Sequence, residues 1–181
     1  MKKYIAALVC ALLCLSLCGC SEKPHDFRDV DWGMSQNQVC KAEGTDYLYA
    51  DDTLLYFSGV QLERACELYY EFEDGGLVGA ECKFTVEEGM ILADFMDIYA
   101  EMHGMLTELY GEPLEADYRI WSSEADRAEH ELDPEAQNIY WQYITYAAHW
   151  QTETSDMALT LDYKDLQINL RLHCDKRTDA A

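Results

Sequence analysis

Basic residues are scarce in this chain of 181 residues. Lysine and arginine together number 13, against 35 aspartates and glutamates, and the formal net charge is −22 at pH 7. A surface of this sign repels the phosphate backbone, so it excludes a nucleic-acid-binding protein. It favours cationic ligands, divalent ions and basic proteins as partners, or it serves only to keep the protein soluble.

The chain also lacks a long hydrophobic run at its start. The apolar stretch from Ile5 to Leu17 has 13 residues, whereas a membrane-spanning helix needs about 20. Two lysines precede this stretch, and Gly19 and Cys20 follow it. A basic start, an apolar core, a small residue and a cysteine are typical of a bacterial lipoprotein signal that is cleaved before Cys20. An ordinary cleaved signal and a retained membrane anchor are the alternatives.

The predicted lipidation divides the chain into four parts. Residues 1–19 are the signal peptide, 20–27 a tether, 28–176 a single globular domain and 177–181 a tail. Because the signal peptide holds two lysines and no acid, the remaining 162 residues carry a formal charge of −24. Such a charge opposes contact with anionic headgroups, so the acyl chains on Cys20 would hold the protein on the outer side of the cell membrane.

No pair among the four cysteines after Cys20 has the C-x-x-C spacing of a redox or zinc motif. Two of them, Cys66 and Cys82, flank a predicted hairpin. A three-residue loop at 73–75 would place these two thiols directly opposite each other. They are interpreted either as a disulfide of an exported protein or as a reduced pair in the core.

Catalytic motifs are lacking as well. The sequence has no Gly-x-Ser-x-Gly elbow, no His-Glu-x-x-His helix and no two histidines three or four residues apart. We therefore assign no catalytic residue, cofactor or metal ligand. The acidic segment 124–135 lacks the glycine and closing glutamate of an EF-hand, which favours a solvated loop over a loose calcium site.

Hydrophobic periodicity predicts an α+β fold. Ser35 and Gln38 form a capping box for a helix that Gly44 ends, and an apolar stripe predicts a long helix over 88–110. Alternating residues predict strands, and Pro134 favours a short helix over 134–140. The predicted strands are 54–58, 65–73, 77–86, 144–154, 157–163 and 166–174. We expect a mainly antiparallel sheet packed against one long helix, and two helix-plus-meander halves as the finer interpretation.

One strand presents a candidate interface. Alternation over 65–73 places Glu67, Tyr69 and Glu71 on the face opposite the core. Aromatic and acidic side chains together suit a basic or sugar-bearing partner. The alternative is that another part of the chain covers this face.

Several short motifs carry a resemblance to known proteins. They are Trp32-Gly33-Met34-Ser35, Leu68-Tyr69-Tyr70-Glu71-Phe72, Tyr110-Gly111-Glu112-Pro113, Trp121 and Trp150-Gln151-Thr152. Together they resemble a group of uncharacterised lipoproteins from Gram-positive bacteria of the clostridial kind, which implies location and fold. A helix opened by Gly-Met-Ser before an antiparallel meander is also similar to BamE-type assembly lipoproteins and to the β-lactamase inhibitor protein. Those proteins bind other proteins.

The expected function is that of a membrane-anchored envelope lipoprotein. It would act as a non-enzymatic binding or scaffolding module for an extracytoplasmic protein or cationic ligand. The alternative is an extracytoplasmic hydrolase that uses carboxylates on wall or sugar substrates.

Overall fold

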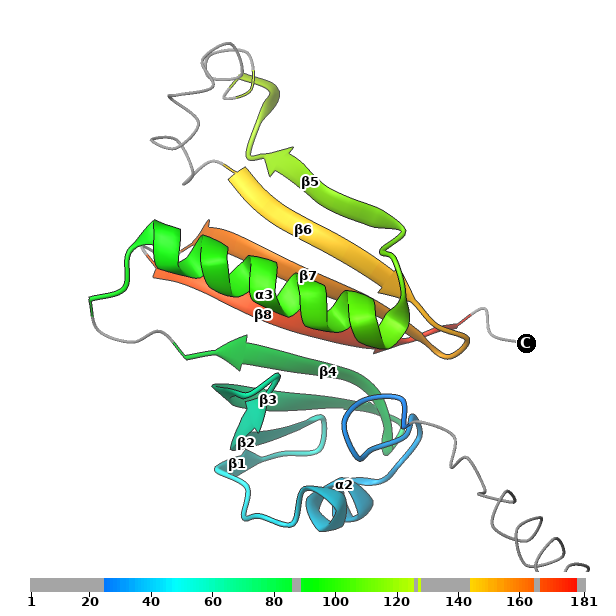
Figure 1. Ribbon diagram of the computed structural model, residues 1–181. Coiled ribbons are helices and arrows are strands. Elements are labelled where there is room, and N and C mark those ends of the chain that lie inside the picture. Colours follow the sequence, from blue (N-terminus) through cyan, green and yellow to red (C-terminus); the bar gives the residue numbers. More distant parts are fainter. Residues whose placement is uncertain (1–24, 86–88, 126, 128–143, 165–166, 179–181) are drawn as a thin grey trace, which may run out of the picture.

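The computed structural model describes residues 25–85, 89–125, 127, 144–164 and 167–178. These residues form an α+β fold with two helices and one antiparallel sheet (Figure 1). The helices are α2 (Gln36–Glu43) and α3 (Leu92–Tyr110). The strands are β1 (Tyr49–Ala50), β2 (Leu54–Gln61), β3 (Arg64–Glu73), β4 (Gly76–Phe84), β5 (Glu115–Trp121), β6 (Ile144–Gln151), β7 (Ser155–Lys164) and β8 (Gln167–Lys176).

The strand order across the sheet is β1-β2-β3-β4-β8-β7-β6-β5, and every neighbouring pair is antiparallel. Helix α2 precedes strands β1 to β4, helix α3 precedes β5 to β8, and β4 pairs with β8 at the centre. The predicted α+β class with a mainly antiparallel sheet is confirmed. The expectation of a single long helix is not, because the described residues contain two helices and are mostly sheet.

Local sequence signals explain where both helices begin and end. The Ser35 backbone N–H donates to Gln38 Oε1 at 2.9 Å, and Gly44 ends α2 with a φ of 64°. At α3 the Ile91 N–H donates to Asp94 Oδ2 at 2.8 Å. Gly111 follows the last turn with a φ of 86°, a conformation that favours glycine.

Register shows that the two helices pack on the same face of the sheet. Residues opposite each other in paired strands point to the same side. One such row runs Phe57, Leu68, Cys82, Leu172, Leu159 and Ala148, and all six are buried in one continuous core. Helix α3 contacts β6, β7 and β8, whereas Glu43 of α2 accepts a hydrogen bond from the Tyr70 hydroxyl in the neighbouring row.

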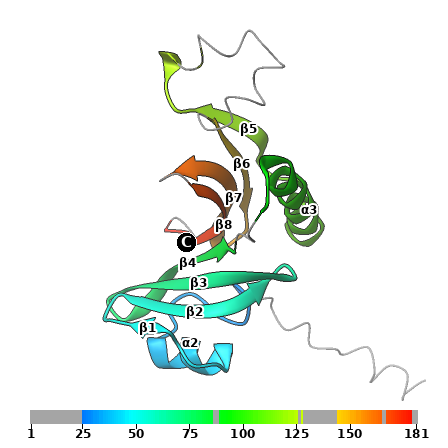
Figure 2. The ribbon, with the colours of Figure 1, turned by 90° about the vertical axis from the view of Figure 1, so that its left-hand side faces the viewer.

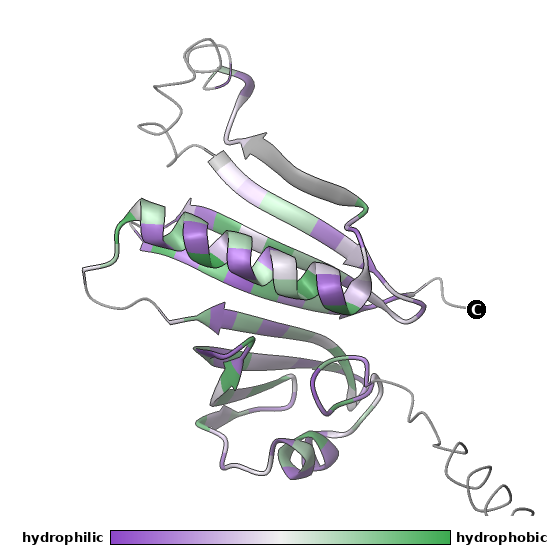
Figure 3. Cartoon of the chain, viewed as in Figure 1, coloured by the Kyte–Doolittle hydropathy of each residue, from purple (hydrophilic) through white to green (hydrophobic). Residues whose placement is uncertain are grey.

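The core side chains explain how each helix is held. Helix α3 buries Phe95, Tyr99, Met102 and Leu106 at helical spacing, and hydrophilic residues alternate with small and apolar ones along its outer face (Figure 3). Helix α2 buries only Val39 fully. Figure 2 shows α3 beside β6, β7 and β8, and α2 beside β1 and β2. The sheet twists between these two groups of strands.

The β3–β4 hairpin corrects a prediction. Its loop has two residues, Asp74 and Gly75, both with positive φ, as expected for a tight hairpin turn. A bulge then shifts the pairing between Glu71 and Phe72. These two single-residue shifts place Cys82 opposite Leu68 rather than opposite Cys66, whose partner is Phe84.

Two strands were missed, and some predictions cannot be placed. The segment 115–121, which is not among the predicted strands, is strand β5, and β1 is an extra edge strand of two residues. The lipidation site Cys20, the helix predicted over 134–140 and most of the acidic segment 124–135 lie outside the described residues.

Candidate interaction surface

The sheet face opposite α2 and α3 carries the predicted interface residues. Neither described helix packs on it, and it is here called the uncovered face in that sense. Glu67, Tyr69 and Glu71 all point to this side, because the residues between them face the core. Register extends the set across the sheet. One row on this face runs Tyr49, Tyr56, Tyr69, Glu81 and His173, from the β1 edge to the central strand β8.

Two tyrosines of this row are held in place by one carboxylate. The rings of Tyr56 and Tyr69 are stacked, with centroids 4.8 Å apart and an interplanar angle of 11°. Both hydroxyls donate to Glu67, at 2.8 Å from Tyr56 and 2.9 Å from Tyr69. Burial and the Glu67 carboxylate raise the pKa of Tyr69, and the same carboxylate raises the pKa of Tyr56. The result is an aromatic surface of fixed orientation with a negative charge at its edge.

A third tyrosine extends the aromatic surface to the edge of the sheet. Tyr49 lies opposite Tyr56, is half exposed and donates its hydroxyl to Asp51 at 2.8 Å. On β2 and β3 the uncovered face holds Glu67 and Glu71 and no basic side chain. Stacked aromatic rings beside carboxylates attract lysine and arginine through both ring and charge.

A shallow depression of about 410 Å³ lies beside the tyrosines. Its lining residues come from β2, β3, β4 and the β7–β8 region: Leu54, Tyr69, Glu71, Glu81, Lys83, Lys164, Asn169 and Arg171. The charges are mixed, with two carboxylates and three cations. This part of the uncovered face therefore suits a polar partner surface better than an apolar ligand.

A buried carboxylate holds two of those cations. Asp162 accepts hydrogen bonds from the Arg171 guanidinium and from Asn169 Nδ2 at 3.2 Å, and Lys164 Nζ lies 3.4 Å from it. The Asp162 side chain is only 4% exposed. Because a buried charge needs partners, these contacts support the sheet, and they reduce the positive charge that a ligand would meet.

Three charged groups lie together where β4 pairs with β8, at the centre of the sheet. His173 Nε2 lies 2.9 Å from Asp175 Oδ2, and His173 Nδ1 lies 3.7 Å from Glu81 Oε2 on β4. Glu81, and to a smaller extent Asp175, raise the pKa of His173 to about 9. The same histidine lowers the pKa of Glu81. The imidazolium thus links β4 to β8 at neutral pH.

One carboxylate of the depression does not have the character of a general acid. Glu71 and Glu81 line it together, which is the arrangement that the alternative function calls for. A general acid, however, needs a raised pKa, and the pKa of Glu81 is lowered by His173. Glu81 therefore gives the hydrolase hypothesis no support.

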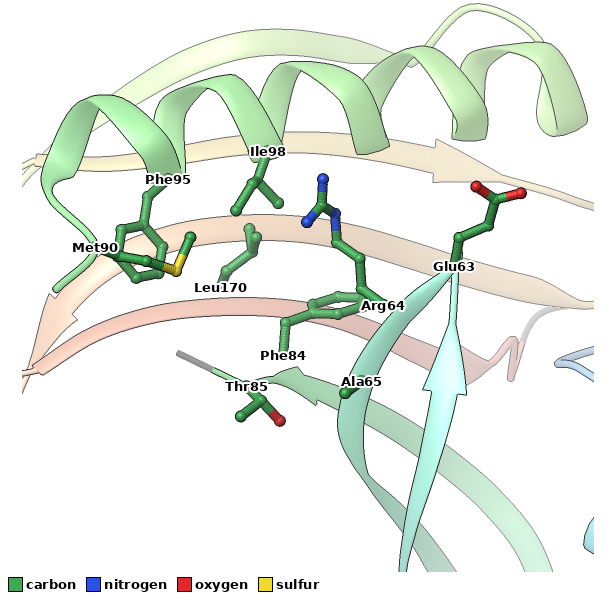
Figure 4. Close-up of a pocket in the computed structure, with 9 residues that line it drawn as sticks. All are labelled: Glu63, Arg64, Ala65, Phe84, Thr85, Met90, Phe95, Ile98 and Leu170. Carbon is green, nitrogen blue, oxygen red and sulfur yellow. The ribbon is translucent and has the colours of Figure 1, made fainter. Parts of the chain in front are cut away.

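A second pocket lies on the helix side, between the start of β3, the end of β4 and the start of α3 (Figure 4). Its volume is about 200 Å³, smaller than the roughly 300–1,000 Å³ of typical ligand sites. The floor is apolar, including Phe84, Phe95 and Leu170, and Arg64 at its rim forms an ion pair with Glu101 of α3. We interpret this pocket as a packing gap between α3 and the strand ends beneath its first turns.

The remaining predicted residues are structural or cannot be placed. Cys66 and Cys82 are buried free thiols, and burial raises the pKa of Cys82. Within the described ranges, no group of three or more histidine, cysteine or acidic residues is arranged to hold a metal ion. No helix in that same part of the chain is long and apolar enough to cross a membrane.

Sequence reasoning found Tyr69 but missed Tyr56 and Tyr49. The signal for Tyr56 was present, because it alternates with the core residues Leu55 and Phe57. Its pairing with Tyr69 depends on the register of β2 against β3. The two-residue strand that carries Tyr49 is too short for any periodicity to be visible.

Comparison of the chain with protein-family models, with curated proteins and with solved structures gives no match. The resemblance to envelope lipoproteins therefore stays a prediction from the sequence motifs.

Proposed function

We propose that this chain is an envelope lipoprotein, anchored through Cys20, that binds a basic segment of an extracytoplasmic protein on the uncovered face. The observation that carries the proposal is the placement of both helices on one side of the sheet. This placement leaves the stacked Tyr56 and Tyr69, bonded to Glu67, on the other side. Catalysis plays no part in this function.

Charge supports a cationic partner. After removal of the signal peptide the chain would have a formal charge of −24, which attracts basic proteins over a distance of about 10 Å at moderate salt. Close to the surface, Glu71 and Glu67 offer carboxylates, while the tyrosine rings offer faces for lysine or arginine. Glu67 is already bonded to two hydroxyls, so Glu71 is the more available carboxylate.

The finer division into two helix-plus-meander halves fits this function. Each half would supply four strands, and pairing of β4 with β8 makes one broad surface from both. The row from Tyr49 to His173 draws on strands of both halves, and a surface of that breadth suits a protein partner better than a small molecule.

The experiment is affinity capture from detergent-solubilised membranes, with lipidation of Cys20 verified first by mass spectrometry. Wild-type protein should recover a basic partner in stoichiometric amount. Tyr69→Ala and Glu71→Lys should lose it, and added salt should weaken it. Asp97→Lys is the matched control, because Asp97 is likewise an exposed acid and lies on α3, on the other side of the sheet.

Two results would contradict the proposal. One is recovery of no stoichiometric partner together with turnover of wall fragments, which would favour the hydrolase. The other is a partner that Glu71→Lys and Asp97→Lys retain equally, which would move the interface off the uncovered face.

A further inference from the structure

Exposed apolar side chains gather at one end of the molecule. Leu109 is 65% exposed, Tyr110 41% and Leu114 68%, all within six residues where α3 ends and β5 begins. We call these three residues the apolar patch. Single exposed apolar residues are ordinary on a protein surface, but a group of large ones marks a contact site.

The chain enters the described fold beside this patch. His25 and Asp26 line a depression of about 370 Å³ together with Leu109, Tyr110 and the β6–β7 turn at 152–154. Asp26 is fixed there, because its carboxylate accepts the Trp32 backbone N–H at 2.9 Å and the Thr154 hydroxyl. In Figure 1 the end of α3, the β6–β7 turn and the start of the described chain lie toward the same side.

We propose that the apolar patch contacts the surface of the membrane and orients the domain on it. The inference rests on the proposed lipid at Cys20. His25 lies five positions after Cys20, and five residues of extended chain span at most about 18 Å. With its acyl chains in the bilayer, Cys20 holds the patch within reach of the headgroups, where leucine and tyrosine side chains are favoured.

The acids around the patch limit the depth of this contact. Glu108, Glu112 and Glu153 are exposed next to it. Carboxylates remain in the hydrated headgroup layer and are repelled by anionic lipids. The contact is therefore shallow, and it is stronger on zwitterionic than on anionic bilayers.

The test uses the full lipidated chain in vesicles of zwitterionic lipid with brominated acyl chains. A fluorescent amino acid is introduced at position 109 or at position 91. Ile91 is the matched control, because it is 64% exposed and lies at the opposite end of the same 19-residue helix, roughly 28 Å away. Emission at 109 should be quenched and emission at 91 should not, and anionic lipid should reduce the quenching at 109.

A charge in the patch sharpens the test. Leu114→Asp should reduce quenching of the probe at 109, whereas Leu48→Asp, at an equally exposed leucine before β1, should leave it unchanged. Equal quenching at 109 and 91, or none at either with the lipid verified on Cys20, would overturn the inference while leaving the anchor intact. Absence of the lipid by mass spectrometry would instead overturn the proposed function on which it rests.

Discussion

The two halves of the sheet, β1 to β4 and β5 to β8, have their apolar face covered in different ways. Helix α3 is about 28 Å long and buries four large side chains over β6 to β8, whereas α2 is about 12 Å long and buries only Val39 fully. In the first half the missing cover is supplied by the segment before α2, which buries Phe27 and Val30. One amphipathic helix thus covers the apolar face of the second half, whereas two separate segments cover that of the first.

The segment before α2 has little local structure of its own. A single bridge pairs Phe27 with Val30, and Arg28 has a positive φ of 50°. Polar contacts attach this segment to α2 and β3. The Arg28 guanidinium is bonded to both oxygens of Glu43 on α2, and Glu43 also accepts the Tyr70 hydroxyl from β3. The first half therefore depends on a buried ion pair where the second depends on helical periodicity.

The largest loss of stability should come from removing a buried aromatic side chain, either from the segment before α2 or from α3. Phe27 is 4% exposed and Phe95 of α3 is 3% exposed, so Phe27→Ala and Phe95→Ala should each destabilise the fold by about 3–5 kcal/mol. Urea unfolding measures both. A loss below about 0.5 kcal/mol for Phe27→Ala, the range of surface substitutions, would show that the segment does not serve as cover. Leu48→Ala, at an exposed leucine, is the control.

A smaller loss of stability should follow removal of a buried carboxylate, and it should differ between Glu43 in the first half and Asp162 in the second. Glu43→Ala leaves the Arg28 guanidinium without its buried partner and should cost roughly 3 kcal/mol. Asp162→Ala should cost less, roughly 1.5–3 kcal/mol, because Lys164 is 66% exposed and can be solvated by water. Double-mutant cycles with Arg28→Ala and with Arg171→Ala would measure each coupling. A larger coupling at Asp162 would reverse the comparison.

Prediction from sequence was correct where one period dominates and wrong where single residues set the register. The stripe from Phe95 to Leu106 and the alternation from Cys66 to Phe72 identified the long helix and the core face of β3. The two-residue turn at Asp74 and the bulge beside Glu71 each moved the pairing by one residue. Alternation survives such a double shift, because a strand has a period of two, so the core face was still correct.

The cover of the first half was not predictable from local pattern. Phe27 and Val30 lie in a segment without helical or strand periodicity, and this segment was divided between a tether and the first folded element. Their burial depends on contacts far along the chain, such as the edge-to-face contact of the Phe27 ring with Tyr70, with centroids 6.1 Å apart. Only part of the tyrosine surface was predicted, because local pattern does not show how strands pair. Tyr69 follows from alternation, and Tyr56 joins it only through pairing between strands.

The smallest effect tests the strand pair that joins the halves. The pKa of His173 is raised to about 9, chiefly by Glu81 across the β4–β8 pair, from an ordinary value of 6.5. A raised pKa means that the charged form is favoured in the folded state. The resulting stabilisation is fully present below about pH 6.5 and is lost as the pH rises through 9. His173→Gln should remove that part of the pH dependence, so the urea midpoints of wild type and variant should converge between pH 6.5 and 9.5. Parallel profiles would mean that this histidine does not hold the two halves together.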